Sequence, residues 1–146
     1  MPNLLPNIKA TLASGAAAVA TTNVTGSTID MSGFEGVAFF LQAGAITDGN
    51  LSVKAAGGAA SDGSDKSDLA GTLTTITNAQ DNDVCILDLY RPTQRYITPI
   101  IVRGGATGAV VQGLVAVQYG PHTKPTTQDA TVVGSKLIVS PALGTA

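Results

Sequence analysis

The strongest constraint on the fold of this chain is a series of short apolar runs separated by turn residues. Between residues 24 and 120, stretches such as GVAFFLQAG, VCILDLY and GAVVQGLVAVQYG are rich in branched and aromatic apolar residues. Turn residues separate the runs at intervals of roughly 8 to 15 residues, as in antiparallel sheets. No stretch between them has the period of an amphipathic helix. The sequence therefore predicts an all-β fold, either an antiparallel β-sandwich or a jelly-roll-like barrel.

Two of the predicted strands carry apolar side chains on both faces. In the first, alternation sets Val37, Phe39 and Leu41 on one face against Ala38, Phe40 and Gln42 on the other. In the last strand, strict alternation groups Gly113 with Val111, Val115, Val117 and Tyr119, opposite Leu114 and Ala116. Such strands lie in the interior of a protein, or a second subunit covers their outer face.

The chain length of 146 residues suits one domain with two arms. We expect a β-sandwich domain over residues 23–122. Residues 1–22, which end in ASGAAAVATT, predict an extended or loosely ordered N-terminal arm, because Gly15 interrupts any helix there. Residues 123–146 contain one strand-like piece, SKLIVS. It is either an extra edge strand of the domain or part of a C-terminal arm that adds to a neighbour's sheet.

The charge content argues against several classes of partner. The chain has eight basic and ten acidic residues and a net charge of −2. The basic residues are scattered, which does not suit a nucleic-acid binder. No segment reaches the roughly 18 apolar residues of a membrane span, and the N-terminus does not resemble a signal peptide. We expect a protein made in the cytoplasm that binds neither nucleic acid nor membrane. Its weakly charged surface suits assembly with other protein.

The residues that usually carry chemistry are sparse. Cys85 lies in VCILDLY and is expected to be a small buried side chain, and the single histidine, His122, follows the last long strand. We therefore expect no enzyme, no cofactor and no catalytic or metal site. Asp62, Asp65 and Asp68 form an acidic loop, SDGSDKSDL. It is either a solvated surface loop or a weak cation site.

Two predicted turns join strands. Asp48-Gly49-Asn50 is a turn signal, and Arg91-Pro92-Thr93-Gln94 is predicted to be the turn of a hairpin formed by the runs VCILDLY and RYITPIIV. Pro99 in the second run cannot donate to a ladder, so that strand has an edge, a bulge or an unpaired position there. The arginines at the second turn can bind carboxylates of a neighbouring protein, or they are solvated or paired within the chain. The candidate protein-contact residues are Arg91, Arg95, Tyr96 and His122.

One family resemblance is carried by the order of these strands. The stretches are GFEGVAFFLQAGAITDGNLSVK, a loop ending in SDLAGT, and QRYITPIIVRGGATGAVVQGLVAVQYGPHTKP. The shared pattern is a hydrophobic strand running into GAITDG, a DGS-type loop, an arginine–tyrosine strand and a valine-rich strand that ends at a proline–histidine pair. Over about residues 24–122, the chain resembles small virion proteins of tailed bacteriophages that occur with the major capsid protein. Its loop departs from the group, because DGSDKSDL lacks the aromatic residues often found there.

The resemblance implies a capsid decoration, or cement, protein. Such β-rich subunits sit on the outer surface of the phage head, often as homotrimers, and hold neighbouring capsomers together. The implied partners are the major capsid protein and further copies of this chain, and the implied location is the virion. Two other classes stay open: another virion part, such as a tail, neck or head-fibre base protein, and a glycan-binding β-sandwich module.

Overall fold

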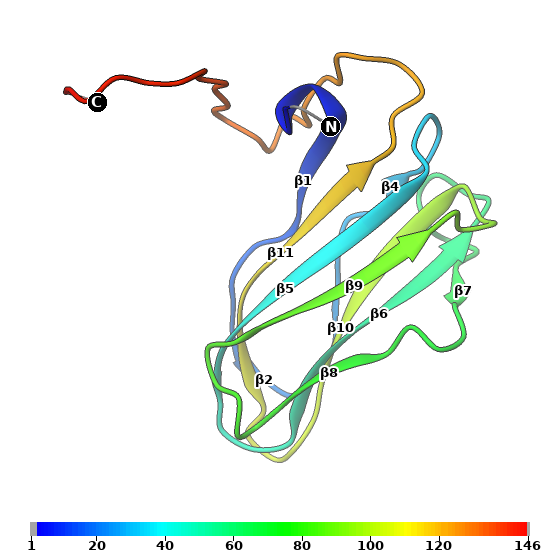
Figure 1. Cartoon of the computed structure of the whole chain (residues 1–146). Helices are drawn as coiled ribbons and strands as arrows, with labels where there is room; N and C mark the ends of the chain where they lie inside the picture. Colours follow the sequence, from blue (N-terminus) through cyan, green and yellow to red (C-terminus); the bar gives the residue numbers. More distant parts are fainter. Residues whose placement is uncertain (1–2, 146) are drawn as a thin grey trace.

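The computed structural model describes residues 3–145 and contains two antiparallel sheets packed face to face (Figure 1). The five strands of sheet A are β1 (Ile8–Ser14), β2 (Ala17–Ala20), β5 (Gly36–Ile46), β9 (Val84–Tyr90) and β11 (Ala109–Tyr119). The six strands of sheet B are β3 (Val24–Thr25), β4 (Ile29–Asp30), β6 (Asn50–Gly58), β7 (Ser67–Asp68), β8 (Thr74–Thr77) and β10 (Tyr96–Arg103). A short 3-10 turn, η1 (Leu5–Asn7), precedes β1. The predicted all-β sandwich is confirmed.

Long strands lie in the middle of each sheet. Sheet A has the order β1-β11-β5-β9, and β2 also pairs with β11; sheet B has the order β3-β10-β6-β7. The chain crosses between the sheets from β9 to β10, so these two strands do not pair and the predicted hairpin at Arg91–Gln94 is wrong. It also crosses from β5 to β6 and from β10 to β11, and Asp48 joins these two crossovers. Its carboxylate accepts the amides of Ala106 at 2.6 Å, Thr107 at 2.9 Å and Gly108 at 2.7 Å. These bonds lower the pKa of Asp48 and close one end of the sandwich.

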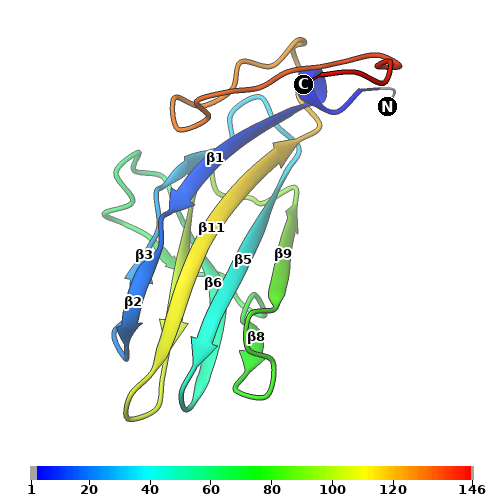
Figure 2. The ribbon, with the colours of Figure 1, turned by 90° about the vertical axis from the view of Figure 1, so that its left-hand side faces the viewer.

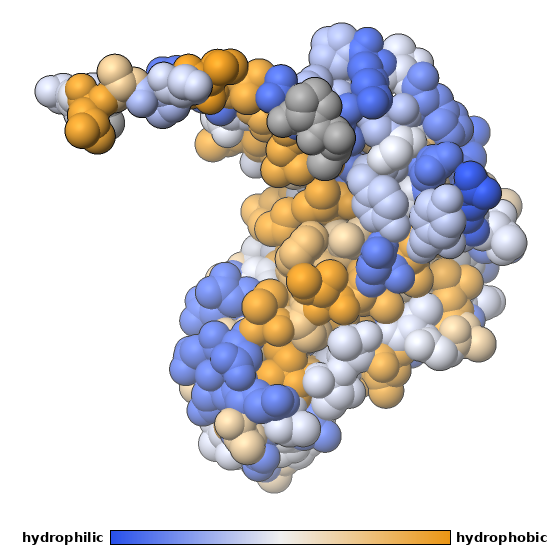
Figure 3. All heavy atoms as spheres, viewed as in Figure 1, coloured by the Kyte–Doolittle hydropathy of each residue, from blue (hydrophilic) through white to orange (hydrophobic). Residues whose placement is uncertain are grey.

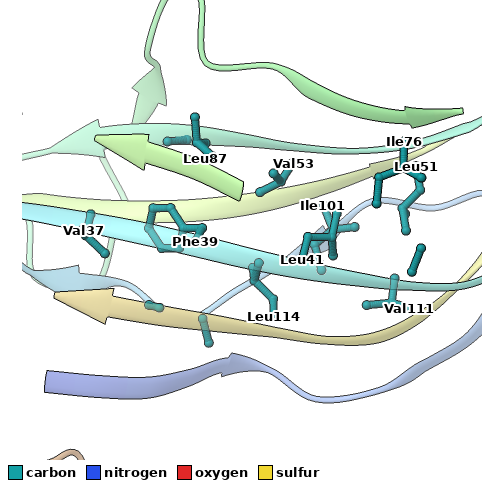
Figure 4. Packing of buried hydrophobic residues seen from close by; sticks show 14 of the residues in the cluster. Val37, Phe39, Leu41, Leu51, Val53, Ile76, Leu87, Ile101, Val111 and Leu114 are labelled. Atoms are coloured by element: carbon teal, nitrogen blue, oxygen red, sulfur yellow. The ribbon is translucent and has the colours of Figure 1, made fainter. Parts of the chain in front are cut away.

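The core fills the space between the inner faces of the two sheets (Figure 4). Val37, Phe39 and Leu41 of β5 point inward, as alternation predicted, and are fully buried. They pack against side chains of sheet B such as Val53 and Ile101. Burial of this kind contributes roughly 1.5–3 kcal/mol for each large apolar side chain.

The N-terminal segment corrects the expectation of an arm over residues 1–22. Residues 8–20 form β1 and β2, and both pair with β11 at the edge of sheet A. Thr11 and Ala13 point inward and are buried, whereas Leu12 between them is exposed, which is the alternation of a strand. The low complexity of the alanine-rich stretch obscured it. Small side chains suit this edge, because β1 and β2 are packed on the inner side only.

A β-bulge in β11 corrects the predicted grouping of its side chains. The register with β5 shifts between Val111 and Gly113. As a result, Val111 is buried together with Leu114 and Ala116, while Val115 points outward. An extra residue in one strand reverses the alternation beyond it. Strict alternation, which placed Val111 with Val115, is therefore wrong at this position.

Pro99 lies where one ladder of sheet B is interrupted, as predicted. On one side of β10, β4 pairs with residues 96–97 and β3 pairs with residues 100–101. Between these two short strands the chain leaves the ladder, and Gly26 donates its N–H to the Pro99 carbonyl at 2.8 Å. The missing N–H of proline is thus placed where no ladder bond is needed.

The C-terminal segment begins along the free edge of β1. The Gln128 Oε1 accepts the N–H of Ala10 at 2.8 Å, and the Thr131 hydroxyl accepts the N–H of Leu12 at 2.9 Å. Residues 132–145, which we call the C-terminal tail, form no strand and project from the body (Figures 1 and 2). SKLIVS therefore forms no edge strand of its own domain, and the alternative of an arm that adds to a neighbour's sheet stays a prediction.

Arg103, the last residue of β10, is buried and bound by backbone oxygens. Its Nη1 donates to the carbonyl oxygens of Ala18 at 2.6 Å and Ala109 at 3.1 Å, and its Nε donates to that of Thr22 at 2.7 Å. These acceptors lie on β2, on β11 and in the segment after β2. A buried guanidinium needs such partners to offset its loss of hydration. The Arg103 side chain of sheet B thereby ties β2 and the segment after it to β11 of sheet A.

Replacing Arg103 with Met is expected to lower the free energy of unfolding by about 3 kcal/mol. Charged hydrogen bonds are lost and buried carbonyl oxygens are left without a donor, each such loss costing roughly 1–3 kcal/mol. Urea unfolding followed by circular dichroism measures the difference. Arg91→Met is the matched control, because Arg91 is exposed and its loss should cost less than about 1 kcal/mol. Equal losses in the two variants would contradict the structural role of Arg103.

Candidate protein-contact surfaces

The predicted contact residues gather at one end of the sandwich. Arg91, Arg95 and His122 line one open groove of about 510 Å³. Tyr96 lies beside it, with the Arg95 guanidinium carbon 5.0 Å from the centre of its ring. Backbone bonds hold the loops together, since the Met31 N–H donates to the Arg95 carbonyl at 2.8 Å. We call this set the charged tip: Asp30, Glu35, Arg91, Arg95, Tyr96 and His122.

Both arginines of the charged tip have carboxylate partners in the same chain. Arg95 donates from Nε and Nη2 to the two oxygens of Asp30, both at 2.9 Å, and Arg91 Nη2 lies 3.4 Å from a Glu35 oxygen. The Arg95 hydrogen bond lowers the pKa of Asp30. The Arg91 guanidinium also lies over Tyr90, 5.1 Å from the ring centre. Of the alternatives left by the sequence, pairing within the chain is present in the structure.

The exposure of these pairs leaves them open to a partner. The side chains of Arg91 and Arg95 are 67% and 58% exposed. Exposed ion pairs typically contribute about 0–1 kcal/mol, so exchanging an intrachain carboxylate for one on a neighbour costs little. His122 is also exposed. Its backbone N–H donates to the Gly33 carbonyl at 2.8 Å, which fixes the chain at this end.

A second surface was indicated by the sequence only through the apolar outer residues of β5. On the outer face of sheet A, a row of side chains crosses four strands in direct register. Its members are Leu12 of β1, Val115 of β11, Phe40 of β5 and Ile86 of β9. All four are at least partly solvent-exposed, and Val84, next along β9, is 58% exposed. We call these five residues the apolar face.

The apolar face is visible as a continuous surface. Figure 2 looks onto β1, β11, β5 and β9, and Figure 3 shows an apolar band below the projecting tail. Neighbouring strands lie about 4.8 Å apart, so a row over four strands spans roughly 15 Å. The face is hollowed by a groove of about 560 Å³ with Gln42, Asp83 and Gln112 at its polar margin. Large contiguous apolar patches on soluble proteins occur at protein or membrane interaction sites, in ligand-binding grooves and in aggregation-prone surfaces. The apolar face is therefore a candidate contact surface.

Tyr119 bounds the apolar face at the end near the charged tip. Its hydroxyl donates to Asp88 Oδ1 at 2.6 Å, and its ring occupies the space where a side chain at Gly36 would lie. Burial, followed by the hydrogen bond to Asp88, raises the pKa of Tyr119 to about 12. Glycine at position 36 is therefore required for the ring to lie flat across β5.

The C-terminal tail carries further unpacked apolar side chains. Leu137 and Ile138 are each about half exposed, and Val139 is 78% exposed. Val133 and Leu143 make almost no contact with the rest of the chain. The sequence indicated a strand-like piece at SKLIVS, but only its placement in the structure shows that these side chains are half to fully exposed.

The acidic loop holds its own backbone. Carboxylate oxygens of Asp62 and Asp65 accept loop amides at 2.9–3.0 Å, and the resulting bonds lower the pKa of both side chains. Asp68 pairs with Lys54 Nζ at 2.6 Å. Within residues 3–145, no three acidic, histidine or cysteine side chains are grouped closely enough to hold a metal ion. The aspartates anchor the loop, each through different partners.

Cys85 packs against the core from β9 and is half-buried. Burial raises the pKa of its thiol, which favours the unreactive protonated form.

Over the described part of the chain, no helix has the length and apolar character to cross a membrane. Searches against models of protein families, curated proteins and solved structures found no match for this chain.

Alkaline titration should distinguish Tyr119 from the other tyrosines. Its phenol is expected to ionise at about pH 12, because burial and Asp88 disfavour the phenolate. Its ordinary pKa is 10.0, so its contribution to stability is complete below pH 10 and is lost as the pH rises towards 12. Phenolate absorbance in wild type and Tyr119→Phe identifies the group, and Asp88→Asn should lower its midpoint. An unchanged midpoint in Asp88→Asn would contradict this assignment.

Proposed function

We propose that this chain is a capsid decoration protein, which binds the outer surface of a tailed-phage head and stabilises contacts between capsomers. The observation that carries the proposal is the apolar face, an exposed apolar row across four strands that has no cover among residues 3–145 and so suits a subunit that works in an assembly. The sequence resemblance to small virion proteins supports the same class. A rigid β-sandwich with unpacked apolar surface suits a protein that acts by filling space between other proteins.

The size of the molecule is sufficient for such contacts. A standard protein interface buries about 800 Å² on each partner. The chain has 8046 Å² of accessible surface, so one interface of that size would use roughly a tenth of it. Separate interfaces with another copy and with the shell can therefore coexist on one subunit.

We assign the contact with the shell to the charged tip. Its arginines are exposed, lie at the end of the sandwich opposite the Asp48 crossovers, and are held by weak exposed pairs. Arginine forks bind carboxylates in fixed geometry, which gives direction to a docking contact. The major capsid protein would supply those carboxylates.

Copy number tests the proposed function. Gel densitometry of purified virions that contain this chain should find hundreds of copies per particle, because decoration sites repeat over the whole shell. Recombinant protein should also bind expanded shells that lack it. About a dozen copies or fewer would instead identify a neck or tail component. Failure to bind such shells at micromolar concentration would overturn the proposal.

Replacing both Arg91 and Arg95 with Ala tests the role of the charged tip. Shell affinity is expected to fall at least tenfold at low salt, and the remaining binding should depend less on salt, since two screened charges are removed. Lys54→Ala with Lys66→Ala removes the same charge elsewhere and is the control. Unchanged affinity and salt dependence in the arginine variant would leave the tip without a role in shell binding.

A further inference from the structure

We infer that the apolar face of one copy of this chain binds the C-terminal tail of a second copy. The two surfaces are complementary in kind: one is an apolar sheet face with no cover among residues 3–145, and the other is an extended segment whose large apolar side chains are half to fully exposed. This inference concerns self-association and does not rest on the proposed binding to a phage shell.

The face offers a site of suitable shape. The groove of about 560 Å³ is floored by Leu12, Phe40 and Val115 and is flanked by Val84 of the edge strand β9. Only β5 pairs with β9 in sheet A, so one edge of β9 carries backbone groups without a ladder partner. An extended segment laid over the groove meets apolar side chains on the face and polar groups at its margin, as bound peptides do.

The tail supplies matching side chains. Leu137, Ile138 and Val139 form a continuous apolar stretch directly after Lys136. In an extended segment Leu137 and Val139 point to the same side, and burying them in the groove would gain roughly 25 cal/mol for each Å² of apolar surface removed from water. Extended residues span about 3.3 Å each, so the fourteen residues of the tail reach roughly 45 Å, well beyond the width of one sheet.

Charge favours the same pairing. Lys136 is the only charged side chain of the C-terminal tail, residues 132–145. The groove is lined by Asp83 and by no basic residue. A lysine next to the apolar stretch can therefore reach a carboxylate at the margin of the groove. This pair sets the direction in which the tail lies, because the reversed orientation would separate the two charges.

A second copy is favoured over the chain's own face by the turn at the start of the tail. Thr131 is fixed to the edge of β1 through Leu12, and Asp129 accepts its N–H at 3.0 Å and its hydroxyl at 2.8 Å. The Val132 N–H then donates to the Asp129 carbonyl at 2.9 Å. This turn directs the tail away from its own sheet (Figure 1). Each copy can thus give a tail to one neighbour and accept one, and the rotation between neighbours sets whether the copies form a closed ring or a filament.

Disulfide trapping between two different variants tests the inference. In a Cys85→Ala background, one chain carries Ile86→Cys on the face, and a differently tagged chain carries Val133→Cys, Leu137→Cys or Val139→Cys on the tail. After co-expression and mild oxidation, at least one tail position should give a disulfide-linked heterodimer in high yield. The control partner, Ser64→Cys on the exposed acidic loop, should give at least tenfold less.

Oligomeric state gives an independent readout in purified protein. By light scattering, the full chain is expected to be an oligomer, whereas a chain ending at Thr131 and the variants Ile86→Asp and Phe40→Asp should be monomers. Each monomer should keep the circular dichroism of wild type. The shortened chain leaves the core intact, so it remains informative if a face variant fails to fold.

Three results would overturn the inference. They are a monomeric full chain, an oligomer that persists without the tail, and a yield of disulfide-linked heterodimer no higher than that of the Ser64→Cys control. All three are measured without phage shells. The binding of recombinant protein to shells that lack it therefore tests the proposed function separately. A protein that binds shells as a monomer would refute the tail exchange and leave the decoration role standing.

Discussion

The pairing of β5 with β11 is the contact that organises both the core and the surface of this protein. Each strand is eleven residues long, and their register sets Phe39 opposite Ala116 on the inner side and Phe40 opposite Val115 on the outer side. A shift of one residue would exchange the two sets. The bulge after Val111 makes such an exchange within β11 alone. As a result, the strand has side chains buried in the core on both sides of the bulge.

Buried polar side chains then attach the N-terminal segment to this frame. Arg103 binds backbone oxygens of Ala18 and Thr22 at one end, and Gln118 Nε2 donates to the Asp30 carbonyl at 2.8 Å at the other. Both side chains are almost fully buried. Donors on the central strands β10 and β11 thus satisfy carbonyls in a segment whose strands are too short to pair fully. The N-terminal residues are held as part of the sandwich for this reason.

Much of the fold could be predicted from local patterns. The turn at Asp48-Gly49, the central strands and the interruption at Pro99 depend on neighbouring residues, which the sequence displays directly. The bulge at Val111 and the attachment of β1 could not be predicted, because the bulge depends on β5, which lies about 70 residues earlier in the chain, and β1 pairs with a strand that follows it by more than a hundred residues. At the charged tip, the sequence grouped Arg91 with Arg95. The carboxylates that pair with them come from a distant loop.

The two contact surfaces differ in the kind of free energy that they can supply. At the charged tip, every new ion pair replaces one already present in the chain, so the net gain is small and the contact contributes direction and salt sensitivity. The apolar face has no such competitor within residues 3–145, and each Å² covered there adds to affinity. A subunit with this division would hold its own copies together through the face. It would then orient the assembled oligomer on a larger partner through several tips at once, where modest contacts combine by multivalency.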